Sequence, residues 1–427
     1  MTSSASLTPA QRRVLDSLDE PAMVDRLRRL VRVPSVTGTD AESELQNTMA
    51  GDLAGLGFEV DLWRLDLEAL EADPDHPGTE VDRSEGYGLV GLAPGEGEPG
   101  FVLQGHVDVV PVGDPAAWAG GDPFGGAVTG DVVHGRGACD MKAGVAVNFA
   151  VAQALATSGV RFEKRFALHQ VVSEEDGGLG AFATMKRGHR GEAAVITEPT
   201  SGRIVVANAG ALTFEIRVPG RAAHGSTRLE GVSAFEAFWP VHAALRALEQ
   251  RINAAPGPLF DGNPLPYGIS VGTIRAGDWA SSVPDLLVAQ GRLGVPLDGD
   301  PVVARAQLEE AVAQACAPAP WVRAHPATVA RPGGPLAPGH REAGHPLVGQ
   351  TADAVELTQG RRPRLGAAPY GSDLRLYVGV GGIPTLHYGP GDVRLAHAPR
   401  EQVSVSEMFV VARALAVLAV DRLGGHL

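Results

Sequence analysis

The sequence predicts an α/β protein in which a mainly parallel sheet, flanked by helices, is interrupted by an inserted α+β domain. Short apolar segments that suit buried strands alternate with longer segments of helical periodicity, a pattern typical of parallel sheets. After Asn208 the pattern changes to strands in which apolar and polar residues alternate. The chain has 427 residues, too many for one compact core, so two domains are expected.

Hydrophobic periodicity places the elements of the first part of the chain. An amphipathic helix is expected over 23–33, and Pro34 ends it because the residue before a proline is pushed out of the helical region. The segment before Leu30 is left open between a flexible arm and a short helix. Further helices are expected at 42–56 and 143–157, and strands at 58–62, 87–92, 100–103, 166–172 and 193–197.

The part of the chain beyond Asn208 predicts a different architecture. Its order is strand 211–218, helix 233–251, strands 269–274 and 286–293, and helix 303–316, which suggests a ferredoxin-like lid. A Pro/Gly-rich linker at 331–339 precedes a helix at 347–358, short strands at 374–378 and 385–388, and a final helix at 406–418. We therefore expect one domain formed by 1–207 and 326–427, with the lid domain inserted at 208–325.

Composition argues against several classes of function. The formal charge of −14 argues against a nucleic-acid partner, which would require a basic face. The two cysteines, Cys139 and Cys316, lie far apart and predict no disulfide framework, which fits a reducing, cytoplasmic compartment. We see no secretory leader and no run of about 18 apolar residues, so we expect no membrane span.

Three short apolar strands each end in charged residues. The segments are LQGHVD, VVSEED and VITEP, and they bring His106, Asp108, Glu174, Glu175 and Glu198 to strand ends. Ligand sites of parallel sheets lie beyond the carboxyl ends of the strands. We therefore expect these side chains to form one site.

Each of these residues also has an ordinary structural interpretation. His106 and Asp108 would point to the same side of an extended segment, but a loop histidine capped by an aspartate has the same pattern. Asp140 in HGRGACDMK could cap the following helix or bridge two ions. Glu174 and Glu175 would point opposite ways on an extended backbone, unless SEED is simply an acidic turn.

Together these residues supply histidine and carboxylate ligands without a cysteine. Such a donor set suits zinc, cobalt or manganese in a catalytic role. A pair of ions about 3.5–4 Å apart would polarise a carbonyl and lower the pKa of a bound water.

The motifs, taken in order, resemble those of a known family. LQGHVDVVP, WAGGDPF, GRGACDMKAG, SEEDGG, ITEPT, GRAAHGS, SSVPD and AHAPRE follow the order and spacing of the co-catalytic zinc family of acetylornithine deacetylase, succinyl-diaminopimelate desuccinylase and carboxypeptidase G. The resemblance covers nearly the whole chain, from about Leu27 to the C-terminal helix. It implies a catalytic α/β domain, a lid that also forms a homodimer, and two divalent ions, with zinc expected and cobalt or manganese as alternatives.

The resemblance also implies roles for single residues. The metal ligands would be His106, Asp140 as the bridge, Glu175, Glu198 and His397. Glu174 would be the general base, and Asp108 would orient His106. His224 would stabilise the oxyanion, often from the partner subunit. The substrate carboxylate would be bound by Arg375, with Arg292 and Asn208 as weaker candidates.

The reaction that the resemblance implies is hydrolysis of an N-acyl amino acid, or a related amide bearing a carboxylate, by a metal-bridging hydroxide. The expected partner is therefore a small N-acyl amino acid or a short peptide. The alternatives are a dipeptidase or carboxypeptidase, and a non-catalytic relative that binds metal or a small molecule.

Overall fold

The computed structural model describes residues 6–118, 121–317, 320–330, 336–340 and 344–427. The predicted linker at 331–339 and the WAGGDPF motif at 118–124 fall partly outside these ranges. The chain forms two compact units: one of 1–206, 340–366 and 373–427, and one of 207–339 and 367–372. The division into functional domains at 207/208 and 325/326 stays a prediction.

A mainly parallel sheet is the centre of the first unit, as the predicted fold class requires. Its strand order is β1-β2-β6-β3-β7-β15-β8-β13, with β14 beside β8. The bounds are β1 (Glu59–Arg64), β2 (Tyr87–Leu92), β3 (Phe101–His106), β6 (Phe166–Val171), β7 (Ala194–Ile196), β8 (Ile204–Asn208), β13 (Gly339–His340), β14 (Leu365–Ala368) and β15 (Thr385–His387). Strands β6, β3, β7 and β15 run parallel, so their carboxyl ends meet at one edge.

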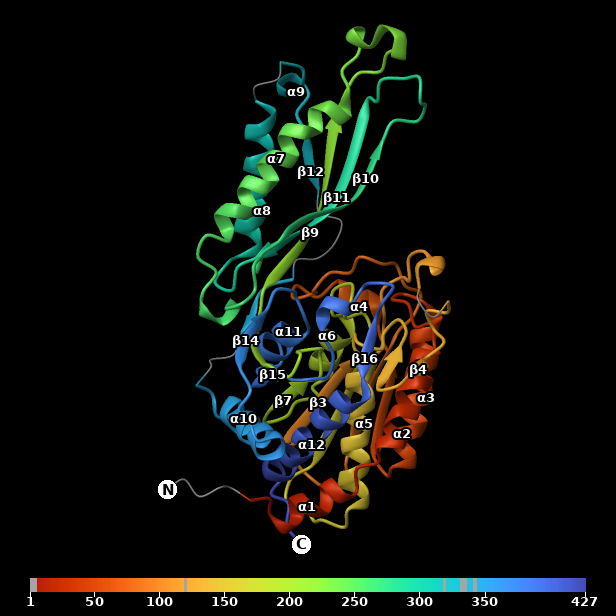
Figure 1. Cartoon of the computed structure of the whole chain (residues 1–427), viewed down its shortest axis with the longest axis vertical. Helices are drawn as coiled ribbons and strands as arrows, with labels where there is room; N and C mark the ends of the chain where they lie inside the picture. Colours follow the sequence, from red (N-terminus) through yellow and green to blue (C-terminus); the bar gives the residue numbers. More distant parts are fainter. Residues whose placement is uncertain (1–5, 119–120, 318–319, 331–335, 341–343) are drawn as a thin grey trace. The chain divides into compact units, whose positions relative to one another are not determined.

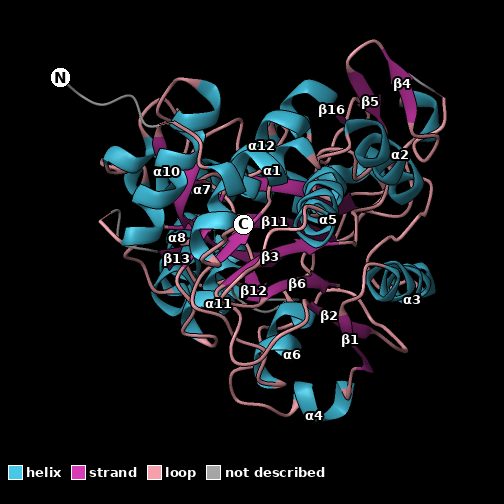
Figure 2. Ribbon diagram, turned by 90° about the horizontal axis from the view of Figure 1, so that it is seen from below, coloured by secondary structure: helices cyan, strands magenta, loops and turns pink. Residues whose placement is uncertain are grey.

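Helices cover both faces of this sheet. The helices of the first unit are α1 (Pro9–Asp16), α2 (Glu20–Val31), α3 (Asp40–Gly55), α4 (Leu67–Glu71), α5 (Lys142–Thr157), α6 (Leu179–Lys186), α10 (Pro346–Gln359), α11 (Leu374–Gly379) and α12 (Val405–Arg422). Figure 2 shows α5 and α12 on one side of β2, β3 and β6, and α6 with α11 on the other. Phe182 of α6 and Tyr377 of α11 belong to one buried cluster with Val102 and Val171 of the sheet.

A second, small sheet joins distant parts of the first unit. It has the order β16-β5-β4, with β4 (Ala127–Thr129), β5 (Val132–His134) and β16 (Gln402–Ser404). Strand β16 pairs antiparallel with β5, so that Gln402 lies opposite His134. The sequence did not predict these three strands, each of which has three residues.

The second unit is an antiparallel sheet covered by two long helices, which follow the predicted strand and helix order (Figure 1). The sheet order is β10-β11-β9-β12. The bounds are β9 (Gly210–Pro219), α7 (Ala234–Ile252), β10 (Ile269–Ala276), β11 (Leu286–Val295), α8 (Pro301–Cys316), α9 (Pro320–Ala324) and β12 (Thr328–Ala330). Phe214, Val241 and Leu308 lie in its larger buried core, and Phe260 and Tyr267 belong to a smaller one.

One predicted element is wrong and one open question is settled. Residues 374–378, predicted as a strand, form helix α11, because Leu374 and Tyr377 share the helical face that packs in the α6 cluster. The segment before Leu30 contains helix α1, whose N-cap Thr8 forms a capping box with Gln11.

None of the helices in the described part of the chain has the length and apolar character that crossing a membrane requires.

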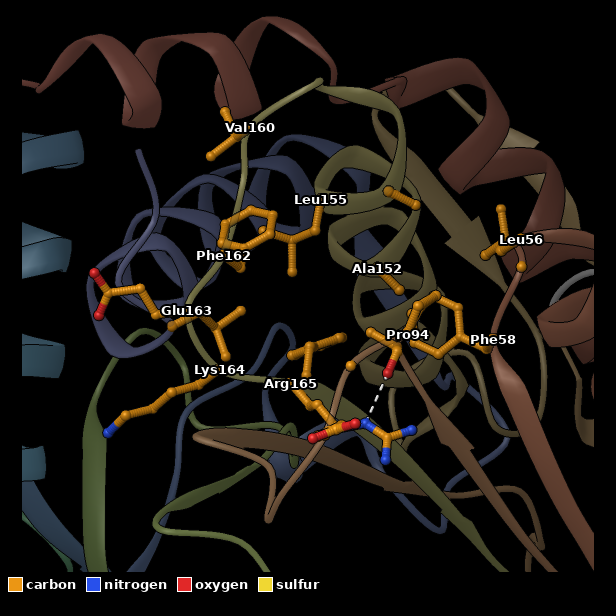
Figure 3. A pocket seen from close by; sticks show the side chains of 17 residues that line it. Leu56, Phe58, Pro94, Ala152, Leu155, Val160, Phe162, Glu163, Lys164 and Arg165 are labelled. Atoms are coloured by element: carbon orange, nitrogen blue, oxygen red, sulfur yellow. Dashed lines mark hydrogen bonds between the residues drawn. The ribbon is translucent and has the colours of Figure 1, made fainter. Parts of the chain in front are cut away.

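A cavity of about 330 Å³ lies beside the first residue of β6 (Figure 3). Its lining is mainly aliphatic and aromatic and includes Leu56, Phe58, Leu155, Val160 and Phe162. Arg165 also lines it, but its Nε donates to the carbonyl of Ala93 at 2.9 Å and its Nη2 pairs with Glu59 at 2.6 Å. Because β3 and β6 run parallel and His106 is the last residue of β3, the cavity and the charged strand ends occupy opposite edges of the sheet.

Gly144 provides a test of how closely α5 packs on the end of β7. A Cβ built on Gly144 would lie 2.2 Å from the carbonyl oxygen of Thr197. We expect Gly144→Ala to lower the free energy of unfolding, because such overpacking costs about 1–3 kcal/mol. That loss exceeds the gain in helix propensity, which is about 1 kcal/mol at most. Urea denaturation followed by circular dichroism measures the difference.

Gly51 is the matched control. It lies inside α3, is exposed, and a Cβ built there meets no atom within 4 Å. Gly51→Ala is expected to raise the free energy of unfolding by up to about 1 kcal/mol. A Gly144→Ala variant stabilised to the same extent would contradict the close packing of α5 on β7.

Candidate metal centre

The charged residues that follow three neighbouring strands lie together. His106 is the last residue of β3, Glu174 and Glu175 follow β6 in a turn, and Glu198 follows β7. These strands are adjacent and parallel in the order β6-β3-β7. The structure therefore brings together the side chains that the three charged strand ends predicted.

The His106 imidazole is fully buried and its orientation is fixed by the backbone. Its Nδ1 lies 2.9 Å from the carbonyl oxygen of Asp108, which only accepts, so Nδ1 carries a proton and donates. Nε2 then faces Asp140 Oδ1 at 3.3 Å and Glu198 Oε1 at 3.8 Å. This arrangement leaves Nε2 as the nitrogen that could bind a metal ion.

Asp140 places one carboxylate between two imidazoles. Its Oδ1 lies 3.3 Å from Nε2 of His106 and its Oδ2 lies 3.4 Å from Nε2 of His397. Nε2 of His397 also lies 3.0 Å from Glu175. The N-cap residue of α5 is Met141, and no side chain caps the helix, so Asp140 is not the helix cap that its position in the sequence allowed.

The donor set fits divalent metal ions. His106, Asp140 and Glu175 offer ligand atoms that lie within 4.8 Å of one another, and so do His106, Glu174 and Glu198. Two ligand atoms of one tetrahedral zinc lie roughly 3.3 Å apart, given bonds of about 2.0–2.1 Å. The two distances from Asp140 to the histidines match that separation.

The charges of these groups also call for a cation. Burial raises the pKa of Glu174 and of Glu198 well above the usual range, and the negative charge of neighbouring carboxylates adds to it. Burial acts the same way on Asp140, but hydrogen bonds from His106 and His397 outweigh it and hold its pKa low. The charge of Glu175 raises the pKa of His397 from 6.5 to about 11. In the absence of a metal, protons therefore balance the buried carboxylates.

The segment that carries Glu174 and Glu175 is a turn, one of the two arrangements that the sequence left open. Ser173 has a positive φ of 64°, so the backbone leaves the extended conformation of β6 at this residue. The Asp108 carboxylate accepts the N–H of Glu174 at 3.2 Å and that of Glu175 at 3.1 Å. The hydroxyl of Thr37 donates to the same carboxylate at 3.0 Å. Asp108 thus orients His106 through its carbonyl and the acidic turn through its side chain.

A buried ion-pair network that the sequence did not reveal supports the same turn. Glu42 of α3 accepts the N–H of Ser173 at 3.2 Å and pairs with Arg83 at 3.2 Å. Arg83 also lies 3.5 Å from Asp176. The members come from three separate segments, so no local motif indicates them.

The residues predicted to bind the substrate carboxylate lie in both units. Arg375 donates from Nη2 to the carbonyl of Gly177 in the acidic turn at 2.6 Å, and its Nε has no partner among the described residues. In the second unit, Arg292 of β11 donates to the carbonyl of Pro369 at 3.1 Å. Buried Asn208 donates to the carbonyl of Ala209. Their roles toward a substrate stay predictions.

His224 belongs to the second unit and lies in an exposed loop. It precedes a 3-10 helix at Gly225–Glu230 and pairs across an isolated bridge with Ser282. Gly225 N–H donates to the carbonyl of Ser281 at 2.6 Å, so the GRAAHGS and SSVPD motifs support one another.

Metal uptake is expected to release protons at neutral pH. His106 and His397 both have raised pKa values in the metal-free protein and must lose a proton from Nε2 to become ligands. Because the pKa of His397 is higher in the folded chain than in the unfolded chain, its protonated imidazole stabilises the metal-free fold. This contribution is complete below about pH 6.5 and is lost as the pH rises toward 11. An indicator dye in weakly buffered solution measures the protons released per zinc ion bound.

The control is a pair of histidine variants. His397→Asn should release fewer protons than the wild type, whereas His325→Asn, which changes an exposed histidine of the second unit, should release as many. Zinc binding without proton release in the wild type would contradict the charge balance described above.

The comparisons with known proteins agree with this geometry. A model of Peptidase family M20/M25/M40 matches residues 102–421, well over half of the chain. The succinyl-diaminopimelate desuccinylase of Methylobacterium nodulans is 33% identical over 217 residues, 48% of this chain and 50% of that protein. The match thus spans only about half the length of that relative.

Other relatives match over nearly their whole length. The N-formyl-4-amino-5-aminomethyl-2-methylpyrimidine deformylase of Bacillus subtilis is 25% identical over 93% of both chains. The acetylornithine deacetylase of Salmonella arizonae is 26% identical over 89% of this chain and 92% of its own.

Solved structures share the fold at low sequence identity. A di-peptidase of Saccharomyces cerevisiae superimposes with a TM-score of 0.77 at 15% identity and covers 99% of both chains. An M20 family metallo-carboxypeptidase of Sulfolobus solfataricus gives 0.71 at 14% identity, over 94% of this chain and 98% of its own. These likenesses confirm the predicted fold class. With the motifs, the strand-end cluster and the family match in agreement, the chain belongs to peptidase family M20/M25/M40.

Proposed function

We propose that this chain is a metal-dependent amidohydrolase that cleaves an N-acyl amino acid or a related amide bearing a carboxylate. The observation that carries the proposal is the Asp140 carboxylate between the imidazoles of His106 and His397, with Glu174 beside them. We further propose two ions per chain. Zinc is the expected metal, and cobalt or manganese suits the same nitrogen and oxygen donors.

The ligands would be His106, Asp140, Glu175, Glu198 and His397, and ions held there would polarise the substrate carbonyl and acidify a water. Glu174 is the proposed general base. It takes a proton from the water as the oxygen attacks the carbonyl carbon, and it gives that proton to the leaving nitrogen as the C–N bond breaks. The products are a carboxylate and a free amine. Asp108 supports this step by fixing the turn on which Glu174 lies.

His224 is the proposed donor to the oxyanion. Its Nδ1 accepts the N–H of Ser226 at 3.2 Å, so in the neutral ring the proton lies on Nε2. Nε2–H is then available to a developing negative charge. Arg375, with Arg292 and Asn208 as further candidates, is proposed to bind the substrate carboxylate.

The names of the relatives favour an N-acyl substrate over a peptide. The desuccinylase, the deacetylase and the deformylase are each named for removing an acyl group from nitrogen. A dipeptidase or carboxypeptidase is the alternative suggested by two structural neighbours, which share the fold at 14–15% identity. A relative that only binds metal or a small molecule would have no use for Glu174 beside the ligands.

We also propose that the inserted domain, 208–325, acts as a lid and forms a homodimer. Its helix α7 exposes Phe235 and Trp239, which pack edge to face at 5.6 Å, and its edge strand β10 exposes Ile274. Exposed aromatic side chains and an unpaired strand edge favour association with a second chain. A cytoplasmic location is supported by two buried free thiols, Cys139 and Cys316.

Glu174→Gln tests the hydrolase proposal. The amide cannot take up the proton of the attacking water, so kcat should fall by at least about 10²-fold, while the zinc content stays at that of the wild type. Mass spectrometry of a panel of N-acyl amino acids and dipeptides, incubated with zinc- or cobalt-loaded protein, identifies the products. Glu249→Gln, which changes a buried carboxylate of the second unit, is the control and should retain activity.

The panel also separates the alternatives. Release of acyl groups supports the proposal, and cleavage of dipeptides alone would favour the peptidase alternative. Two bound ions with no product from any substrate would leave only a binding role.

Mixing two inactive variants tests whether His224 acts from the partner subunit. Removing one oxyanion donor costs about 10²–10³ in kcat, so His224→Ala alone should be nearly inactive. A mixed dimer of His224→Ala and Glu174→Gln holds one site with both residues intact and should regain part of the activity. The assay is hydrolysis after the two variants are unfolded together and refolded.

His242→Ala is the control, because His242 is an exposed histidine of α7 outside the GRAAHGS motif. It should keep wild-type activity. Failure of the mixture to regain activity would place His224 in its own subunit's site or outside catalysis.

A further inference from the structure

Behind Asp140 lies a second buried carboxylate that fixes its backbone. The N–H groups of Cys139 and Asp140 both donate to Oε1 of Glu401 at 3.0 Å. The Glu401 residue is 1% exposed, so no water competes for these two bonds. The position of Asp140, the carboxylate between the two histidines, therefore depends on Glu401.

Glu401 also belongs to the segment that carries His397. It follows that histidine by four residues, its N–H donates to the carbonyl of Ala398, and its own carbonyl accepts the N–H of Gly135. The segment continues into β16, which pairs with β5 just ahead of the Asp140 turn. Glu401 thus joins the two segments that supply Asp140 and His397, at the point where the small sheet ends.

Arg136 holds the other oxygen of Glu401. Its Nη1 pairs with Oε2, its Nη2 donates to the carbonyl of Pro111 at 3.2 Å, and its guanidinium lies 5.1 Å from the centre of the Trp118 ring. The positive charge of Arg136 balances the negative charge of Glu401. The pair therefore brings no net charge to the site, and its effect on Asp140 is one of position.

We propose that Glu401 is a positioning residue that holds Asp140 and His397 at the separation the two metal ions require. It acts through Asp140 and sets the affinity for metal without binding an ion itself. This inference rests on the proposed metal site. Hydrogen-bonding partners behind metal ligands typically change metal affinity by about 10- to 100-fold when they are removed.

Two variants of Glu401 isolate the acceptor oxygen. Glu401→Ala removes the acceptor, whereas Glu401→Gln keeps one carbonyl oxygen within reach of the same two N–H groups. Both variants remove the negative charge that pairs with Arg136, so the difference between them reports the loss of the acceptor and of the side chain that carries it, not the loss of the charge. We expect Glu401→Ala to bind at least one zinc ion about 10- to 100-fold more weakly than the wild type, and Glu401→Gln to lose clearly less.

Three measurements distinguish positioning from a general loss of stability. Competition with a chromophoric chelator gives the zinc affinity, the d–d absorption of the cobalt-loaded protein reports ligand geometry, and steady-state kinetics should show a fall in kcat with KM nearly unchanged. If Glu401→Ala does not fold, Glu401→Met, which keeps the length of the side chain but has no oxygen acceptor, takes its place in the comparison with Glu401→Gln.

Glu249 provides a matched control. It is 8% exposed, accepts the N–H of Ile269 at 2.6 Å and pairs with Arg246 at 2.8 Å, the same arrangement in the other unit. Glu249→Ala should lower thermal stability but leave the zinc affinity and the cobalt spectrum unchanged.

Equal zinc affinities of the wild type and Glu401→Ala would overturn the inference. So would equal losses in Glu401→Ala and Glu401→Gln, or an equal loss in Glu249→Ala. A wild-type chain that binds no metal would instead overturn the proposed metal site.

Discussion

Negative charge gathered at one edge of the central sheet is the constraint on which the rest of the first unit depends. The charged strand ends and the turn before α5 direct one imidazole and five carboxylates into one buried region, namely His106, Asp108, Asp140, Glu174, Glu175 and Glu198. His397, whose side chain is 53% exposed, faces Asp140 and Glu175 from the segment before β16. Buried like charges repel unless cations lie between them. The strands cannot separate to relieve this repulsion because their backbone hydrogen bonds and buried side chains hold them together. Cations, whether protons or metal ions, must therefore balance the charge.

The carboxylates of this region fall into two groups according to their partners. Asp108, Glu42 and Glu401 accept backbone N–H groups and are thereby committed to holding turns in place. Asp140 and Glu175 face imidazoles with their oxygens. A carboxylate that accepts backbone N–H groups thus supports a turn, whereas a carboxylate that faces imidazoles is a candidate metal ligand. Of the scaffold carboxylates, Glu42 pairs with Arg83 and Glu401 pairs with Arg136.

Most of the strand and helix order could be predicted from the sequence, because buried strands and Ala-rich helices leave strong local patterns. His106, Glu174, Glu175 and Glu198 could be found because they follow strand ends that meet at one edge. His397 was indicated only by the resemblance to a known family. The local pattern was misleading at Leu374–Val378. Apolar and polar residues alternate there as in a strand, but the segment forms a helix that packs against α6. Local patterns also did not indicate the contacts of Glu401, which ends the AHAPRE motif but whose partner Arg136 lies 265 residues away in the sequence. Interactions between such distant segments exist only in the folded chain.

The first unit is discontinuous in sequence, and this sets an order for its completion during synthesis. His106, Asp140, Glu174, Glu175 and Glu198 all precede the second unit in the chain, whereas His397 and Glu401 follow it. While the ribosome makes residues 207–339, the nascent chain holds the acidic residues of the site without the segment that faces Asp140 from the other side. The site therefore reaches its full complement of side chains only late in translation, and an ion bound before then would meet an incomplete shell.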